Sequence, residues 1–284
     1  PLLAAGSAML LPGDRLRSWL LPATGLLQTG FAGLALMRPD LAAGTSELVL
    51  DPLSRIILLG ITVLYLFCSF YAVGYLKYRR ERSNRIFCTC LLAVLAAMNL
   101  VIWSHHLGLM WVAIEATTLS SAPLIYFNHS KRSIEATWKY LLVGSVGIAL
   151  ALLGTFFLAY SSIREGAKAT MQFELLLKNA PLLSKSWLQA AFILLIIGYG
   201  TKMGLAPMHT WKPDAYGEAP GVVGALLAGC ITSCAFLAFS RVYQICGAAG
   251  LRDGSSGILV FMGLLSMLVA GIFMMNQRDF KRML

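Results

Sequence analysis

The stretch HHLGLMWVAIEATTLSSAPLIYF, His105–Phe127, is 23 residues long and has one charged side chain, Glu115, near its middle. A helix that crosses a bilayer needs roughly 20 mainly apolar residues, so the stretch predicts a transmembrane helix. A second stretch of this kind, WLQAAFILLIIGYGTKMGLAP, Trp187–Pro207, contains only Lys202 as a charged residue. Ionisable groups at bilayer depth are costly and usually mark ion paths. One acid and one base, each near the middle of a span, predict such a path here.

The composition extends this reading to the whole chain. Of its 284 residues, 58% are hydrophobic and 13% are charged, and the mean hydropathy is +0.72. Soluble domains carry roughly 25% charged residues, so we predict an all-α polytopic membrane protein. The net charge of +10 comes from basic residues in loops between apolar runs, which indicates membrane topology and argues against nucleic acid as a partner. We expect the chain to be a piece of a longer polytopic protein.

Apolar runs separated by short polar loops predict about nine transmembrane helices, the first of them partial. Pro207, close after Lys202, predicts that the seventh is broken at mid-membrane. The stretch Gly44–Asp51 alternates polar and apolar residues, which indicates a short strand or hairpin. Met171–Lys178 is an amphipathic patch that we expect on the membrane surface. The spans are 1–11, 19–37, 52–76, 86–104, 106–127, 134–160, 187–206, 221–246 and 256–275.

The basic residues predict the orientation of the chain. Alternate loops place thirteen Lys and Arg on one side, against four on the other when the long 161–186 loop is left out. Cytoplasmic loops carry the excess of Lys and Arg, so the loop Lys77–Arg85, KYRRERSNR, is predicted to face the cytoplasm.

Glu115 and Lys202 are the principal candidate residues. A carboxyl group at that depth can exchange protons when its surroundings shift its pKa. A buried lysine can likewise load and release a proton near neutral pH. The alternative for both residues is structural, an acid and a base that only hold neighbouring helices together. If they conduct protons, they must lie close enough to sense each other's ionisation.

Further ionisable groups flank this pair. Lys139, one turn after Glu135, belongs to the relay or reaches the membrane interface as a surface residue. His209 suits proton uptake because histidine titrates near physiological pH. Asp214 and Glu218 are candidates for the uptake region, and capping of the following helix is the alternative. His105 and His106, at the opposite surface, are candidates for proton exit.

No covalent chemistry is predicted. The six cysteines, Cys68, Cys88, Cys90, Cys230, Cys234 and Cys246, lie in or beside apolar runs, without a CxxC pair or a nearby set of histidines. Because free cysteine is a common buried residue, we expect no metal site and no cofactor. Phosphate-binding loops, dinucleotide fingerprints and haem motifs are also lacking from the sequence.

Five segments of the chain carry distinctive motifs: LDPLS (Leu50–Ser54), FYAVGYL (Phe70–Leu76), LGLMWVAIEATTLSSAPL (Leu107–Leu124), EATWKYLLVGSVG (Glu135–Gly147) and KMGLAPMHTWKPDAYGEAPG (Lys202–Gly221). Together they resemble one known family, the antiporter-like, proton-translocating membrane subunits of respiratory complex I, energy-converting hydrogenases and multisubunit cation/proton antiporters. Among the branches of that family, the sequences IEATTLSSAPL and HTWKPDAYGEAPG are most similar to hydrogenase-4 component F, of the formate hydrogenlyase type.

The resemblance implies an antiporter-like fold with inverted five-helix repeats. It divides a single membrane domain, residues 1–284, into N-terminal helices (1–78), a first repeat (84–246) and the truncated start of a second repeat (255–284). It also implies that Glu115, Lys202 and Lys139 match the family's glutamate and lysines. The chain departs from many relatives in its eighth span, where Gly221–Ser240 contains no Lys or His.

The expected function is that of a proton-translocating subunit of a redox-driven complex in the bacterial inner membrane. Its expected partners are other membrane subunits and, through them, peripheral iron–sulfur or hydrogenase subunits. The chain itself would be a non-redox subunit of an oxidoreductase complex. One alternative is a subunit of a sodium/proton antiporter, and a second is a passive membrane anchor.

Overall fold

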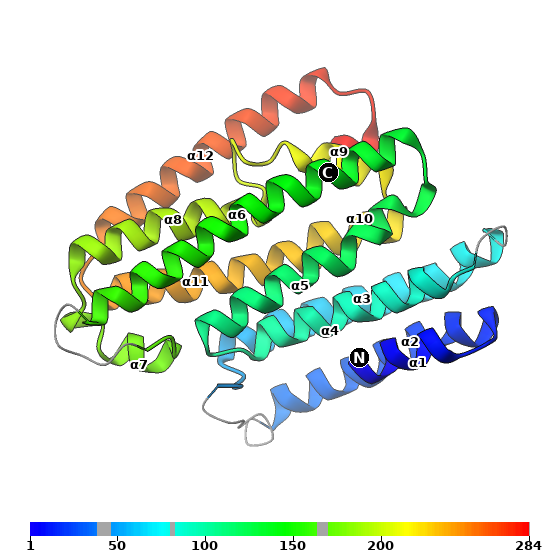
Figure 1. The fold of residues 1–284 in the computed structure, drawn as a ribbon, viewed down its shortest axis with the longest axis horizontal. Helices are drawn as coiled ribbons and strands as arrows, with labels where there is room; N and C mark the ends of the chain where they lie inside the picture. The colour runs from blue at the N-terminus through cyan, green and yellow to red at the C-terminus, as the bar shows by residue number, and fades with distance from the viewer. Residues whose placement is uncertain (39–46, 80–82, 164–169, 284) are drawn as a thin grey trace.

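The computed structural model describes residues 1–38, 47–79, 83–163 and 170–283. Within these ranges the chain is built from helices that run side by side, and none of the described residues belongs to a named strand (Figure 1). The all-α prediction is confirmed. The α-helices are α1 (Leu2–Leu10), α2 (Asp14–Met37), α3 (Pro52–Tyr78), α4 (Arg85–Trp103), α5 (Leu107–Ile125), α6 (Lys131–Ile163), α7 (Phe173–Lys178), α8 (Lys185–Met203), α9 (Trp211–Glu218), α10 (Gly221–Leu226), α11 (Thr232–Ala248) and α12 (Arg252–Asn276).

Seven helices of the described chain are long and apolar enough to cross a membrane. They are α2 to α6, α12 and the continuous helix Gly221–Ala248, in which a π-helical turn, Leu227–Ile231, joins α10 to α11. Two of the predicted spans are not among them. Helix α1 has 9 residues, and α8 has the length, 19 residues, but carries Lys185 and Lys202 near its two ends. The chain is a multi-pass membrane protein, and a total of nine spans stays a prediction.

The helix ends follow local sequence signals. Pro52 occupies the first turn of α3, where its missing N–H is not needed, and the Asp51 carboxylate caps the turn by accepting from the Ser54 N–H at 2.6 Å. Helix α8 ends at Gly204, whose φ of +79° is a left-handed conformation that glycine adopts without steric cost. Residues 204–210 then separate α8 from α9, so the helix that carries Lys202 is interrupted directly after the lysine.

Helices α6 and α8 share the most extensive contact of any helix pair in the described chain, and small residues make their close approach possible. A Cβ added to Gly198 of α8 would lie 2.6 Å from the Ala151 Cβ, and one added to Gly147 of α6 would lie 2.7 Å from Thr201. Small residues allow two backbones to approach closely, which is how helices commonly associate within a membrane. The last turn of α8, including Lys202, is therefore pressed against the first half of α6.

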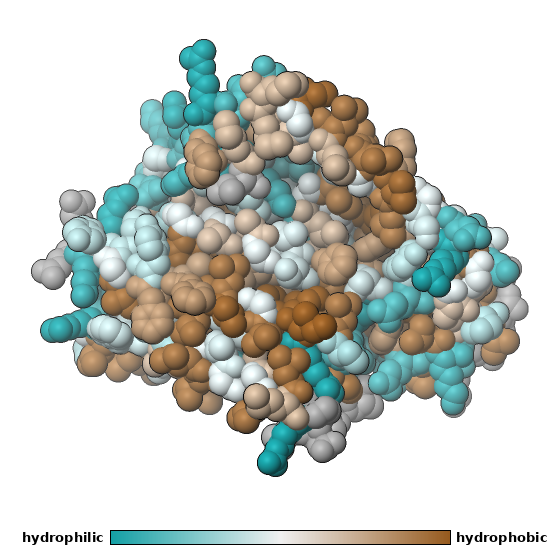
Figure 2. All heavy atoms as spheres, turned by 180° about the vertical axis from the view of Figure 1, so that it is seen from behind, coloured by the Kyte–Doolittle hydropathy of each residue, from teal (hydrophilic) through white to brown (hydrophobic). Residues whose placement is uncertain are grey.

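The outer surface is apolar across the middle of the molecule. In Figure 2, brown side chains gather across the centre of the face, and teal side chains concentrate toward its left and right margins. Exposed large hydrophobic residues occur on many helices, for example Phe67, Leu119, Phe156 and Phe261. A soluble protein rarely exposes so much apolar area, whereas a bilayer covers it.

The loops that the charge count assigns to one side meet at one end of the bundle. Arg79, after α3, donates to the Asn128 side chain at 3.3 Å, and Asn128 in turn donates to the Glu218 carbonyl at 2.9 Å. From the C-terminal segment, Arg282 pairs with Asp214 at 3.2 Å. These contacts join the α3–α4 and α5–α6 connections, α9 and the residues after α12 into one basic end.

At the opposite end, three connections pair through their backbones. The Val49 N–H donates to the Trp103 carbonyl and the His105 N–H to the Glu47 carbonyl, while Leu107 N–H donates to Met171. The predicted strand or hairpin at 44–51 falls partly outside the described residues, and its described part forms an isolated bridge between Leu48 and Ser104. The amphipathic patch 171–178 contains the short helix α7.

Candidate functional site

Lys202 lies at the end of α8 and is 1% exposed. Its Nζ donates to the Thr118 hydroxyl of α5 and lies 5.1 Å from the centre of the Tyr140 ring of α6. Gly144 of α6 provides the room, because a Cβ there would lie 2.8 Å from the Nζ. The ammonium group is thus enclosed by a hydroxyl, an aromatic face and a glycine, and not by a carboxylate.

Glu115 is one helical turn before Thr118, on the same face of α5. Its charge acts electrostatically on Lys202, yet the two groups lie beyond the 4.0 Å of a direct ion pair. The Glu115 Oε2 atom is buried and has no hydrogen-bond partner among the described residues. A buried carboxylate oxygen without a partner is costly, which is unusual for an acid whose role is only structural.

Hydroxyl groups and rings continue the site toward the basic end. The Tyr140 hydroxyl forms a 2.7 Å hydrogen bond with Ser121 of α5, and the Tyr140 ring lies 5.1 Å from the Trp211 ring. The Trp211 indole donates to the Thr201 carbonyl at 2.9 Å, next to Lys202. These contacts tie the start of α9 back to the last turn of α8, so the interrupted helix has a defined geometry on both sides of the break.

The break borders a cavity of about 160 Å³ between residues 204–213 and α12. His209 and Lys212 line one wall, and Ser266 and Phe273 of α12 line the other. The Nδ1 atom of His209 is buried without a hydrogen-bond partner. Water in the cavity would satisfy such an atom, since buried water commonly bonds to otherwise unsatisfied polar groups.

Lys139 does not reach Lys202. Its side chain is 47% exposed and pairs with Glu135 at 2.7 Å and with Asp214 of α9 at 2.9 Å. Consecutive helical residues point about 100° apart, and Tyr140, the next residue, faces the interior. The structure thus places Lys139 at the surface, with its ammonium on Glu135 and Asp214, and its part in the relay stays a prediction.

Asp214 and Glu218 do not cap the next helix. Helix α10 begins after Pro220 and has no side-chain cap. Asp214 lies between Lys139 and Arg282, and the Glu218 carboxylate accepts from Ser130 at 3.3 Å. The capping alternative is wrong, because at this basic end both carboxylates are bound by side chains from other segments.

The two exit candidates differ in their surroundings. His106 caps α5, its Nδ1 accepting from the Leu109 N–H at 3.2 Å. His105 is 3% exposed and lies between two carboxylates, with its Nε2 3.3 Å from Asp51 and its Nδ1 3.8 Å from Glu174.

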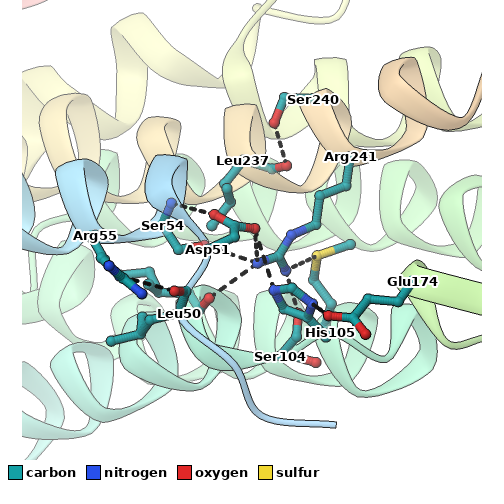
Figure 3. Close-up of polar contacts among 12 residues, drawn as sticks. Leu50, Asp51, Ser54, Arg55, Ser104, His105, Glu174, Leu237, Ser240 and Arg241 are labelled. Carbon is teal, nitrogen blue, oxygen red and sulfur yellow. Dashed lines mark hydrogen bonds and ion pairs between the residues drawn. The ribbon is translucent and has the colours of Figure 1, made fainter. Parts of the chain in front are cut away.

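His105 belongs to a buried cluster that was not predicted from the sequence. We call this cluster the Arg241 clasp; its members are Asp51, Ser54, Ser104, His105 and Arg241. Figure 3 shows these side chains converging from α3, the α4–α5 connection and α11, with Glu174 beyond His105. Arg241 is 1% exposed and donates to the Asp51 carboxylate at 3.2 Å, to Ser54 at 2.9 Å and to the Ser104 carbonyl. A lone arginine near the end of an apolar helix was the signal available in the sequence.

The clasp holds Asp51 ionised. Burial acts to raise its pKa, but contact with His105, the Ser54 N–H and the positive charge of Arg241 outweigh it and hold the pKa well below the ordinary 3.8. A carboxyl group whose folded-state pKa is depressed contributes stability above its unfolded pKa and loses it as the pH falls through the folded value. Asp51 therefore stabilises the fold at neutral pH, and that contribution declines in acid below about pH 3.8.

No candidate metal site is found among the described residues. They contain no group of three or more His, Cys, Asp or Glu that could hold a metal ion. All six cysteines are free thiols, and five of them are buried.

Comparison with known families agrees with this architecture. Residues 104–284 match a family model described as NADH:quinone oxidoreductase/Mrp antiporter, TM. A hydrogenase-4 component F homolog from Methylacidiphilum infernorum is 40% identical over 204 residues, covering 71% of this chain and 43% of that protein. An NADH-quinone oxidoreductase subunit N from Desulforudis audaxviator is 30% identical over 239 residues, covering 84% of this chain and 46% of that protein. The chain spans somewhat less than half the length of these curated relatives.

Among solved structures, the chain resembles one in the membrane-bound sulfane sulfur reductase, an archaeal respiratory membrane complex. The TM-score is 0.86 at 20% sequence identity, over 100% of this chain and 59% of that one. At this identity the likeness shows the fold alone.

Proposed function

We propose a proton-conducting function from one premise, that the chain belongs to the NADH:quinone oxidoreductase/Mrp antiporter transmembrane family. The protein that contains it is a proton-translocating membrane subunit of a redox-driven complex, either a membrane hydrogenase or a complex I-like enzyme. The similarity to a hydrogenase-4 component F homolog and to a complex I subunit N supports the redox-driven reading.

The observation that carries the proposal is the environment of Lys202. Its Nζ is buried beside the neutral Thr118 hydroxyl. The Glu115 carboxylate is close enough for an electrostatic interaction with the Nζ but does not form a direct ion pair with it. Desolvation favours the neutral amine and a nearby carboxylate favours the ammonium, so a modest change in the Glu115–Lys202 separation changes which form is stable. Such a pair is an electrostatic switch that loads and releases one proton.

Proton uptake takes place at the basic end, which is the cytoplasmic side, and the protein lies in the bacterial inner membrane. His209 and the cavity beside it receive the proton, and Lys139, Asp214 and Glu218 form the charged surface that leads to it. On the opposite side His105 is the exit group, because it lies between Asp51 and Glu174. Other membrane subunits are the direct partners, and through them peripheral iron–sulfur or hydrogenase subunits. We also propose that the chain is divided into N-terminal helices (1–78), a first repeat (84–246) and the start of a second repeat (255–284).

A sodium/proton antiporter subunit is the second candidate, because the matching family model is also that of Mrp antiporter subunits. Co-purification from native membranes distinguishes the two. We expect the full-length protein to bring nickel-containing or iron–sulfur subunits with it, detected by mass spectrometry and metal analysis. Recovery of membrane subunits alone, together with sodium-dependent proton flux in liposomes, would establish the antiporter instead. Intact complexes that carry no proton flux under any driving force would leave only a passive anchor.

The exposure of Lys139 leads to a test of the uptake path. Lys139→Gln removes a surface cation, and its partner Asp214 keeps its contact with Arg282. Exposed ion pairs contribute little, so we expect roughly half or more of the proton translocation rate to remain. His209→Gln, at the cavity, is expected to reduce the rate more strongly. Acidification of inverted vesicles measures both, with the neighbouring exposed Arg132→Gln as control. A loss in Lys139→Gln as large as that in a Lys202 variant would place Lys139 within the central relay.

A further inference from the structure

Besides the fully buried Lys202, a partly buried lysine, Lys212, lies at the break, and the relay described above makes no use of it. It is the second residue of α9, and its side chain folds back beneath the end of α8. A Cβ on Gly204 would lie 2.2 Å from the Lys212 Cε and 2.7 Å from its Nζ. Gly204, the residue directly after α8, therefore leaves the space in which the lysine lies. The Nζ also lies 5.8 Å from the centre of the Tyr216 ring.

No carboxylate neutralises this lysine. Within the described part of the chain, Lys212 has no ion pair within 4.0 Å and its Nζ has no hydrogen-bond partner. The nearest acidic residues along the chain are occupied elsewhere, Asp214 by Lys139 and Arg282, and Glu218 by Ser130. A purely structural lysine at this depth would be expected to have a counter-ion, because burying an unpaired charge is expensive.

Lys212 faces the cavity of about 160 Å³ together with His209, whose Nδ1 is also without a partner. One water needs about 10–15 Å³ of such space, so the cavity has room for several waters that can bond to both groups. Lys202, by contrast, points to α5 and α6. Lys202 therefore faces α5 and α6, whereas Lys212 faces the cavity on the other side of the break.

We propose that Lys212 is a second proton-carrying lysine, which exchanges protons between the Lys202 site and the cavity against α12. In the uptake step an N–H bond of the Lys212 ammonium breaks and one forms on the neutral Lys202 amine through intervening water, so charge moves without any oxidant or co-reactant. The proposal rests on the proposed function, since it needs Lys202 to accept a proton from the cavity side.

The test uses the intact complex purified with full-length protein and reconstituted in liposomes. Lys212→Met and Lys212→Arg are compared with Lys131→Met, an exposed lysine at the same end. The ratio of protons moved per electron is measured next to the uncoupled electron-transfer rate. We expect both Lys212 variants to lower the ratio at least about fivefold, because arginine keeps the charge but does not deprotonate. The Lys131 variant and the electron-transfer rates are expected to be unchanged.

Other outcomes overturn the proposal in distinct ways. A normal ratio in Lys212→Arg with a low ratio in Lys212→Met would make Lys212 a fixed charge. A normal ratio in both variants would remove it from the path. If Lys212→Met does not assemble, the arginine variant and Lys212→Gln decide. The proposed function itself fails only if Lys202 variants pump normally, so the two failures are separable.

Discussion

Lys202→Met is expected to abolish proton translocation by the intact complex while the subunit still assembles. Methionine fills a similar volume beside Gly144 and Tyr140, so the contact between α6 and α8 is kept. The variant lacks the amine that accepts the proton at the end of α8, and a proton transfer that loses its acid–base group falls by about 100-fold or more. In liposomes the proton flux is followed by a pH-sensitive dye, and electron transfer is measured with an uncoupler present.

The matched control is Lys185→Met, which removes an exposed lysine from the other end of the same helix. Glu115→Gln is the companion variant. It keeps the shape of the side chain but removes the charge that acts on Lys202, so we expect a strong loss of flux with normal assembly. If Lys202→Met and Glu115→Gln both move protons at the rate of the unaltered complex, the relay does not exist.

The two principal candidate residues could be picked out in the sequence because each stands out from its surroundings. Glu115 and Lys202 are lone charges in apolar stretches of membrane length, and that contrast needs no knowledge of tertiary structure. The interruption after Lys202 was similarly foreseeable from Pro207, although the structure assigns the helix end to Gly204, three residues earlier. That this interruption lies at mid-membrane stays a prediction.

The direction in which a side chain points was harder to predict. The sequence made Lys139 a relay candidate, yet its side chain faces outward. Only the packing of α6 against α5 and α8 shows that Tyr140 and Gly144 are the residues turned toward Lys202. The same limit applies to Asp214, because its partners Lys139 and Arg282 come from segments 75 and 68 residues away in sequence. Local capping rules consider only near neighbours, and they gave the wrong partner.

The Arg241 clasp illustrates the limit most clearly. Asp51 and Arg241 are 190 residues apart. Each has an ordinary local explanation, Asp51 as a helix cap and Arg241 as a cation toward the end of an apolar helix. Nothing in their own neighbourhoods predicts that α3 and α11 bring them together. Long-range ion pairs of this kind are set by helix packing, so neither Asp51 nor Arg241 was a candidate residue in the sequence analysis.

Arg241→Met is expected to be the most destabilising single change at the far end of the molecule. It leaves Asp51 without its cationic partner and removes donors from Ser54 and the Ser104 carbonyl in a buried site. Breaking a buried ion pair by removing one partner costs about 3–5 kcal/mol, which is a large part of the stability of a typical domain. We expect a strongly reduced yield of folded protein, measured by fluorescence-detected size exclusion and by protease resistance in detergent.

The double variant Asp51→Asn with Arg241→Met separates a buried-charge effect from lost packing. Asparagine still accepts a hydrogen bond as a helix cap, and removing both charges leaves none unpaired, so the double variant should be more stable than Arg241→Met alone. Lys178→Met, an exposed cation of α7 at the same end, is the control and should behave like the unaltered protein. Equal losses in the single and double variants would show that Arg241 acts through its packing and not through Asp51. In that case Arg241 would not hold the Asp51 carboxylate in place. The proposed exit role of His105, which depends on that carboxylate, would lose its support.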